Sequence, residues 1–202
     1  MKALLDFNVD YVLEDERVLL RPLAVEDIDH LLHFSLNEPE IWTYSQVRAG
    51  GGKDQMAQYI QMALDARKAD KEYAFVVWDK LKQAYAGSTR FYDIQLNQDT
   101  LQLGYTWYGK DFQRTGLNRH CKFLMLQFAF EQQGFKRVEF RADFENKKSI
   151  TAMKKIGCIE EGVLRNHSYR YDGTRRDSIV LSILEHEWHA GVKENLKALI
   201  RQ

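Results

Sequence analysis

The sequence is poor in the residues that interrupt or cross-link a chain. It has only 2 prolines and 12 glycines in 202 residues, which argues against a disordered or low-complexity protein. Its 2 cysteines, Cys121 and Cys158, are too few for a disulfide framework, and they form no Cys-x-x-Cys pair for zinc or redox chemistry. We therefore expect a reduced, cytoplasmic setting and no structural metal.

An excess of charge of either sign is also missing. Lys plus Arg and Asp plus Glu each number 29, so the formal net charge is zero, which argues against a nucleic-acid binder or a polybasic membrane binder. No apolar run approaches the roughly 20 residues that a membrane span needs. The first ten residues lack the apolar core of a secretory signal. The length fits one domain over residues 1–202.

Hydrophobic periodicity predicts an α/β fold in which a mixed central sheet carries helices on its faces. Helices are expected at 26–36, 53–69, 118–133, 146–156 and 188–200. Strands are expected at 17–23, 73–78, 85–94, 101–108, 137–143, 159–171 and 176–183, and Asp172-Gly173 is a hairpin turn signal.

One stretch combines a strand, a glycine turn and a helix start. Gly104 lies in the middle of the strand 101–108, where a glycine often marks a bulge. The segment Gln113–Asn118 then opens an apolar helix. The free N–H groups of a helix's first turn and its dipole favour an anion, and Arg114 and Arg119 add positive charge. The pattern indicates a pyrophosphate site, and an ordinary strand-to-helix turn remains the alternative.

Two other phosphate motifs are excluded by their residues. Gly50-Gly51-Gly52-Lys53 is followed by Asp54, where a P-loop requires Ser or Thr. No Gly-x-Gly-x-x-Gly follows a predicted strand, which argues against a Rossmann dinucleotide site.

The stretch just described resembles a known family. Gln113-x-x-Gly116-x-Asn118 resembles the Gln/Arg-x-x-Gly-x-Gly/Ala loop with which GNAT N-acetyltransferases bind the pyrophosphate of acetyl-CoA. Asn118 departs from the small residue of that loop but is a good helix N-cap. The segment Leu103–Trp107 resembles the bulged central strand of the family.

The resemblance continues towards the C-terminus. Asn146-x-x-Ser149, followed by Lys155–Gly157, is similar to the family's Asn-x-x-Ser segment and the helix end behind it. Glu161–Arg165 and Arg176–Ser178 resemble the RimJ/RimL-type branch. Any one motif is moderately specific, but their order and spacing together are strongly so.

The resemblance implies a GNAT fold that moves an acetyl group from acetyl-CoA to a primary amine by direct attack. A backbone N–H freed by the bulge would stabilise the oxyanion. Ser149 would protonate the departing thiolate, and its alternative is a helix-surface hydroxyl. Asn146 would contact the cofactor, and its alternative is a helix cap. The residues implied to bind acetyl-CoA are Leu103, Gly104, Tyr105, Gln113, Arg114, Thr115, Gly116, Leu117, Asn118 and Asn146.

The sequence leaves the general base open. Gln102 stands where members of the family often carry a glutamate on the central strand. Glu139 is the carboxylate we assign to the catalytic site. The other candidates are Glu72, Asp93, His120 and His167. Aromatic residues for an acceptor pocket, or else for the core, are Trp42, Tyr44, Tyr105 and Trp107.

The RimJ/RimL likeness makes a protein N-terminal α-amine the leading acceptor. A small-molecule amine, such as a polyamine, an amino acid or an antibiotic, is the second reading. A non-catalytic module that binds acyl-CoA is the third. The expected partners are acetyl-CoA and the amine acceptor. We expect neither a nucleic acid nor a membrane as a partner, and the sequence is compatible with a homodimer.

Overall fold

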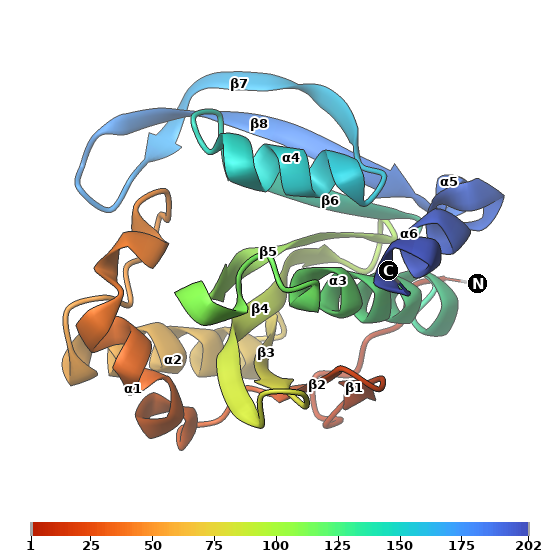
Figure 1. Cartoon of the computed structure of the whole chain (residues 1–202). Helices are drawn as coiled ribbons and strands as arrows, with labels where there is room; N and C mark the ends of the chain where they lie inside the picture. Colours follow the sequence, from red (N-terminus) through yellow and green to blue (C-terminus); the bar gives the residue numbers. More distant parts are fainter. Residues whose placement is uncertain (1, 202) are drawn as a thin grey trace.

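A computed structural model describes residues 2–201, which form one eight-stranded sheet flanked by helices (Figure 1). No helix in this range has the length and apolar character of a membrane span. The strands are β1 (Leu13–Glu14), β2 (Val18–Pro22), β3 (Tyr73–Asp79), β4 (Ala84–Gln95), β5 (Thr100–Tyr108), β6 (Arg137–Asp143), β7 (Ile159–Tyr169) and β8 (Arg175–Leu184). The α-helices are α1 (Asp27–Asn37), α2 (Lys53–Lys68), α3 (Leu117–Gln127), α4 (Lys147–Lys155), α5 (Glu185–Glu187) and α6 (Lys193–Ile200).

The strands lie in the order β1-β2-β3-β4-β5-β6-β8-β7. Every neighbouring pair is antiparallel except β5 and β6, which are parallel. That parallel pairing runs from Thr100↔Arg137 only to Gln102↔Glu139, although both strands continue beyond it. The sheet therefore opens between β5 and β6, as the diverging ribbons in Figure 1 show.

Consecutive residues of β4 show that helices cover both faces of the sheet, because neighbouring side chains of a strand point to opposite faces. Phe91 stacks on Phe128, just after α3, with 6.1 Å between the ring centroids. The guanidinium of Arg90 lies 4.9 Å from the ring centroid of Tyr59 on α2. The predicted mixed sheet with helices on both faces is confirmed.

An aromatic cluster fills the core between the sheet and the helices α1 and α2. The Trp107 ring on β5 lies 5.2 Å from Trp42 and 5.6 Å from Phe34, centroid to centroid. Trp42 and Trp107 are buried. Both tryptophans therefore belong to the core, whereas Tyr44, 38% exposed, faces solvent.

Several element boundaries differ from the sequence prediction. The helix expected at 118–133 ends as an α-helix at Gln127 and continues as a wider π-helical turn, Phe128–Gln132. The helix expected at 188–200 is broken at Gly191, whose φ and ψ are not helical. The short strand β1 and the 3-10 turn Pro39–Trp42 were not predicted.

Candidate active site

The centre of β5 carries a bulge. Ser88 and Arg90 of β4 are two residues apart in the sequence. Their partners on β5, Trp107 and Gly104, are three residues apart, so β5 has one extra residue here. The extra residue coincides with Tyr105, which has a φ of +48°. A side chain at Gly104 would meet the ring of Tyr92, since a Cβ there would lie 2.8 Å from a ring carbon. The predicted bulge is present, and it lies just beyond the last β5–β6 pair.

The segment before α3 forms a tight loop built on two left-handed residues. Arg114 and Gly116 have φ values of +62° and +88°. Thr115 Oγ1 donates to the Phe112 carbonyl at 2.8 Å, and Gln113 Nε2 donates to the Tyr108 carbonyl at 2.9 Å. These side chains hold the loop in shape. The Leu117 N–H donates to Thr115 Oγ1 at 3.5 Å, whereas the N–H groups of residues 114–116 donate to none of residues 2–201 and are left for a ligand.

The space in front of Gly116 is open. A Cβ at Gly116 would have no atom within 4 Å, so a ligand can approach the backbone closely there. Arg114 is exposed, and its guanidinium forms no ion pair with any of residues 2–201. Arg119 instead donates to the Leu199 carbonyl at 2.9 Å, at the end of α6. Of the two arginines, Arg114 is the free cation of the loop.

Asn146 and Ser149 are joined at the start of α4. Asn146 is the N-cap of this helix, and its Oδ1 accepts a 3.1 Å hydrogen bond from the Ser149 backbone N–H. Capping is thus one role of Asn146. Both residues are half-buried, and the hydroxyl of Ser149 hydrogen-bonds to none of residues 2–201. That hydroxyl and the Asn146 amide N–H groups stay available to a ligand.

Glu139 is held between two arginines of its own strand. Its Oε1 accepts from Arg141 Nε at 2.7 Å, and its Oε2 accepts from Arg137 Nη2 at 3.2 Å. Because charge-assisted pairs of this kind are strong, an amine proton could reach Glu139 only if one pair opened. The assignment of Glu139 as a catalytic residue stays a prediction.

The other carboxylates and His120 also have partners. Glu72 accepts from Arg90 Nη1 at 2.7 Å, and Asp93 accepts from Gln102 Nε2 at 2.7 Å. His120 Nδ1 lies 2.7 Å from Asp15, between α3 and the loop behind β1. Glu16 lies near Asp15 and His120. These three residues form the group of metal-ligating residue types found among residues 2–201.

His167 on β7 differs from the other candidate bases. Its Nδ1 lies 3.0 Å from the Ser178 hydroxyl on β8. Burial, and then the positive charge of Arg141 and Arg176, lowers the pKa of His167. The imidazole is therefore mainly neutral at pH 7 and can accept a proton.

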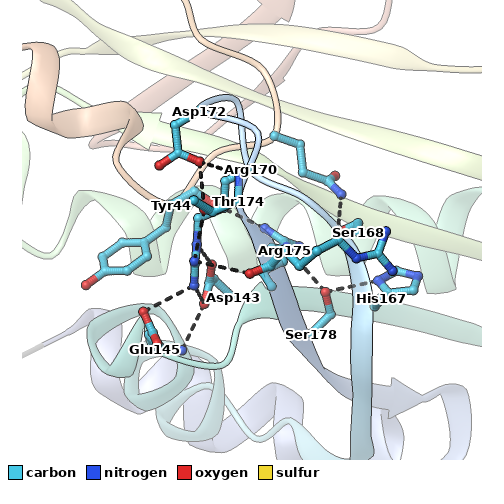
Figure 2. Close-up of polar contacts among 12 residues, drawn as sticks. Tyr44, Asp143, Glu145, His167, Ser168, Arg170, Asp172, Thr174, Arg175 and Ser178 are labelled. Atoms are coloured by element: carbon cyan, nitrogen blue, oxygen red, sulfur yellow. Dashed lines mark hydrogen bonds and ion pairs between the residues drawn. The ribbon is translucent and has the colours of Figure 1, made fainter.

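The loop between α1 and α2 contacts the hairpin of β7 and β8 (Figure 1). Gln46 Nε2 donates to the Ser168 hydroxyl at 2.9 Å, and Arg176 Nη1 donates to the Tyr44 carbonyl at 3.1 Å. Figure 2 shows Tyr44 beside Asp143 and the hairpin residues. The loop between α1 and α2 and the β7–β8 hairpin, which are far apart in the sequence, therefore enclose together the side of the sheet that carries Tyr92.

Sequence reasoning missed a buried arginine beneath the bulge. The Arg90 guanidinium is fully buried. It lies 4.4 Å from the ring centroid of Tyr105 and 4.9 Å from that of Tyr59. Its Nε and Nη2 have no hydrogen-bond partner in the part of the chain that the structure describes. The aromatic faces and Glu72 compensate the charge, so Arg90 supports the bulge residue from below.

Known proteins match this chain in sequence and in fold. The sequence profile of the GNAT acetyltransferase domain matches residues 17–159. A crystal structure of a GCN5-related N-acetyltransferase from Brucella melitensis superposes with a TM-score of 0.87 at 25% identity, over 96% of this chain and 87% of that one. The match to this domain defines an acyltransferase. The chain belongs to the GNAT acetyltransferase family.

Two curated relatives match the sequence as well. "Uncharacterized N-acetyltransferase p20" of Bacillus licheniformis is 24% identical over 177 residues, which are 86% of this chain and 96% of the relative. "Putative ribosomal N-acetyltransferase YdaF" of Bacillus subtilis is 32% identical over 87 residues, which are 43% of this chain and 46% of the relative. The first similarity extends across nearly the whole relative, and the second covers about half of each protein.

Proposed function

We propose that this protein transfers an acetyl group from acetyl-CoA to a primary amine, and that a protein N-terminal α-amine is its acceptor. One observation carries the proposal: the strand β5 connects the bulge at Tyr105 to the loop before α3. An oxyanion donor and an anion-binding helix start thus lie on one continuous stretch of chain. The word "ribosomal" in the name of YdaF supports the choice of a protein substrate.

Acetyl-CoA fits the residues of the loop. Its pyrophosphate would lie in front of Gly116, where the space is open, and accept hydrogen bonds from the backbone N–H groups of Arg114–Asn118. The exposed Arg114 supplies a balancing charge. The thioester end would reach the bulge, where the backbone of Leu103, Gly104 and Tyr105 offers the hydrogen bonds.

The chemistry follows from this placement. The amine nitrogen bonds to the thioester carbonyl carbon, the C–S bond breaks, and the amine loses a proton. A backbone N–H at the bulge stabilises the negative charge that develops on the carbonyl oxygen. The Ser149 hydroxyl gives a proton to the departing thiolate. The Ser149 hydroxyl hydrogen-bonds to none of residues 2–201, and the residue is half-buried.

Removal of the proton from the amine requires only a weak base. An N-terminal α-amine has a pKa near 8, so a sizeable fraction is neutral at pH 7. Neutral His167 can take up the remaining proton, directly or through water. Glu139 would act only after release from Arg137 or Arg141. We therefore place His167 ahead of Glu139 as the proton acceptor.

The proposal is tested by an acetyl-transfer screen. Acetyl-CoA is mixed with the protein and with a panel of peptides that have free N-termini, polyamines, amino acids and aminoglycosides. Free thiol is followed with a colorimetric reagent, and products are identified by mass spectrometry. An acetylated peptide N-terminus supports the proposal. An acetylated small amine alone would move the acceptor to the second class. Binding of acetyl-CoA without any product would indicate a non-catalytic module.

A further inference from the structure

Arg176 on β8 is a buried cation that pairs with no carboxylate of the described residues. The residue is 7% exposed. Its Nε donates to the Ser178 hydroxyl at 3.2 Å, and its Nη1 donates to the Tyr44 carbonyl at 3.1 Å. Burial, the largest influence, lowers the pKa of this guanidinium. A buried charge that meets only neutral acceptors is costly, so a compensating anion would stabilise it.

The acids near Arg176 are already paired. Asp143 accepts hydrogen bonds from Arg170 at 2.6 and 3.1 Å, as Figure 2 shows. Glu139 is held by Arg137 and Arg141. The other buried arginine of residues 2–201, Arg90 on β4, has Glu72 as its partner. Arg176 is therefore a buried cation that forms no ion pair with any carboxylate of residues 2–201.

The same arginine is linked to the proposed base, because the Ser178 hydroxyl that accepts from Arg176 Nε at 3.2 Å lies 3.0 Å from His167 Nδ1. The charge of Arg176 lowers the pKa of the Tyr105 and Tyr92 hydroxyls, against the upward effect of their burial. Tyr105 is the bulge residue. Arg176 Nη2 donates to none of residues 2–201, and it is not among the fully buried atoms that lack a partner, so it keeps contact with solvent. The end of the guanidinium formed by Nη1 and Nη2 can thus meet a ligand.

We propose that Arg176 binds a carboxylate of the acceptor, carried close to the amine that is acetylated. This inference rests on the proposed amine acetyltransferase function and specifies its substrate class. Two sources supply that chemistry: an acidic first or second residue of a peptide, or the α-carboxylate of a free amino acid. The free N–H groups of Nη1 and Nη2 match the two oxygens of a carboxylate.

The contacts of Arg176 also fix its direction. Because Ser178 and Tyr44 hold Nε and Nη1 from β8 and from the loop between α1 and α2, the side chain is oriented before any substrate arrives. A preoriented guanidinium loses little freedom on binding, so it discriminates well between a carboxylate and its amide. We expect a preference of about tenfold or more in kcat/KM, which corresponds to at least ~1.4 kcal/mol.

Matched acid and amide substrates test this on the unmodified protein. One arm compares peptides that carry Glu or Gln as the first or the second residue. The other arm compares alanine with alaninamide. The expected result is a preference of about tenfold or more for the acid in one of the arms, and that arm names the source of the carboxylate. Equal kcat/KM for acid and amide in both arms would overturn the inference while leaving the acetyltransferase intact. Absence of acetylated product from every amine would overturn both.

Variants then assign the preference to this side chain. Arg176→Gln should bring the acid-to-amide ratio close to one, whatever its absolute rate. Arg175→Gln removes the same charge from the neighbouring exposed residue of the hairpin and should keep the ratio. A ratio that survives in Arg176→Gln would show that Arg176 only ties Tyr44 to β8.

Discussion

The ammonium group of Lys122 on α3 donates a 2.8 Å hydrogen bond to the Thr106 hydroxyl on β5. The Thr106 hydroxyl lies in turn 2.7 Å from that of Thr89 on β4. Lys122 is 5% exposed, and burial lowers its pKa to about 8. A charged amine is thus kept beneath the central strands with two neutral hydroxyls as its partners.

The lowered pKa of Lys122 gives a pH-dependent stability. In the unfolded chain the amine has its ordinary pKa of 10.5, so between about pH 8 and 10.5 the unfolded state binds the extra proton. The folded state is therefore penalised below pH 8 and recovers as the pH rises to 10.5. Lys122→Met should raise the free energy of unfolding at pH 7 by on the order of 3 kcal/mol, with the difference disappearing near pH 10.5.

Urea denaturation of the parent and of Lys122→Met at several pH values measures this difference. Lys155→Met is the matched control, because Lys155 is exposed at the end of α4. The control should shift stability little and without this pH dependence. A Lys122→Met protein that is less stable than the parent at pH 7 would mean that the hydrogen bond to Thr106 outweighs the cost of burial.

Acetyl-CoA should stabilise the fold through the loop before α3. At about 100 times its dissociation constant a ligand adds about 2.7 kcal/mol, which is a rise in Tm of about 5–10 °C for a chain of this size. Gly116→Val should abolish that rise, because its side chain would fill the space that the pyrophosphate needs. Thermal melts with and without acetyl-CoA measure it.

Gly173→Val is the control for backbone strain in this experiment. Gly173 has a φ of +83°, close to the +88° of Gly116, and a Cβ at either position has no atom within 4 Å. Both variants should therefore lose similar stability, but Gly173→Val should keep the shift with acetyl-CoA. A shift that persists in Gly116→Val would place the pyrophosphate elsewhere.

No acetyl-cysteine should form during turnover. Cys121 and Cys158 are buried, and burial raises the pKa of each thiol to about 12. Only a thiolate is a competent nucleophile, and about one thiol in 10⁵ is ionised at pH 7. A folded Cys121→Ala, Cys158→Ala double variant should keep most of its turnover. Ping-pong kinetics with a trapped acetyl-cysteine would contradict direct transfer.

Ser149 and Asn146 should differ in the kinetic constant that they control. Ser149→Ala should lower kcat by about 10²-fold while the affinity for acetyl-CoA stays nearly constant, because a proton donor acts only in the transition state. Asn146→Ala should weaken acetyl-CoA binding and also remove the cap of α4. Asn146→Ser keeps a capping oxygen and removes only the amide, so it separates these two effects.

Steady-state rates and isothermal titration with acetyl-CoA provide both constants. If water can protonate the leaving thiolate, Ser149→Ala turns over like the parent, and Ser149 is then a helix-surface hydroxyl. An unchanged dissociation constant in Asn146→Ser would restrict Asn146 to capping.

Local chemistry made much of the fold predictable. Aromatic and β-branched runs, such as residues 73–78, became strands, and α3 begins at Leu117, directly after the glycine of the turn. The bulge was signalled by Gly104, since only a residue without a side chain fits against Tyr92. The loop 113–118 was found through residue types whose backbone conformations are restricted, which makes them informative without a structure.

Long-range pairing explains what the sequence did not reveal. Arg90 and Arg176 look like surface charges in one dimension, because nothing nearby in sequence shows that aromatic rings and a distant loop will bury them. The two arginines that hold Glu139 lie two residues away on either side, so strand alternation could have revealed them. The break at Gly191 was hidden by apolar residues that keep helical spacing around it.

The short parallel ladder between β5 and β6 has a mechanical consequence. Two blocks of sheet, one ending at β5 and the other beginning at β6, are joined by a short ladder from Thr100 to Gln102 and by the bond from the Lys136 N–H to the Asp99 carbonyl just before it. At the far side, the contacts of Arg176 with Tyr44 and of Gln46 with Ser168 are side-chain links between the blocks. Such a body is stiff within each block and compliant at the seam. A substrate bound between β5 and β6 would connect the two blocks, so binding would reduce the motion of one block relative to the other.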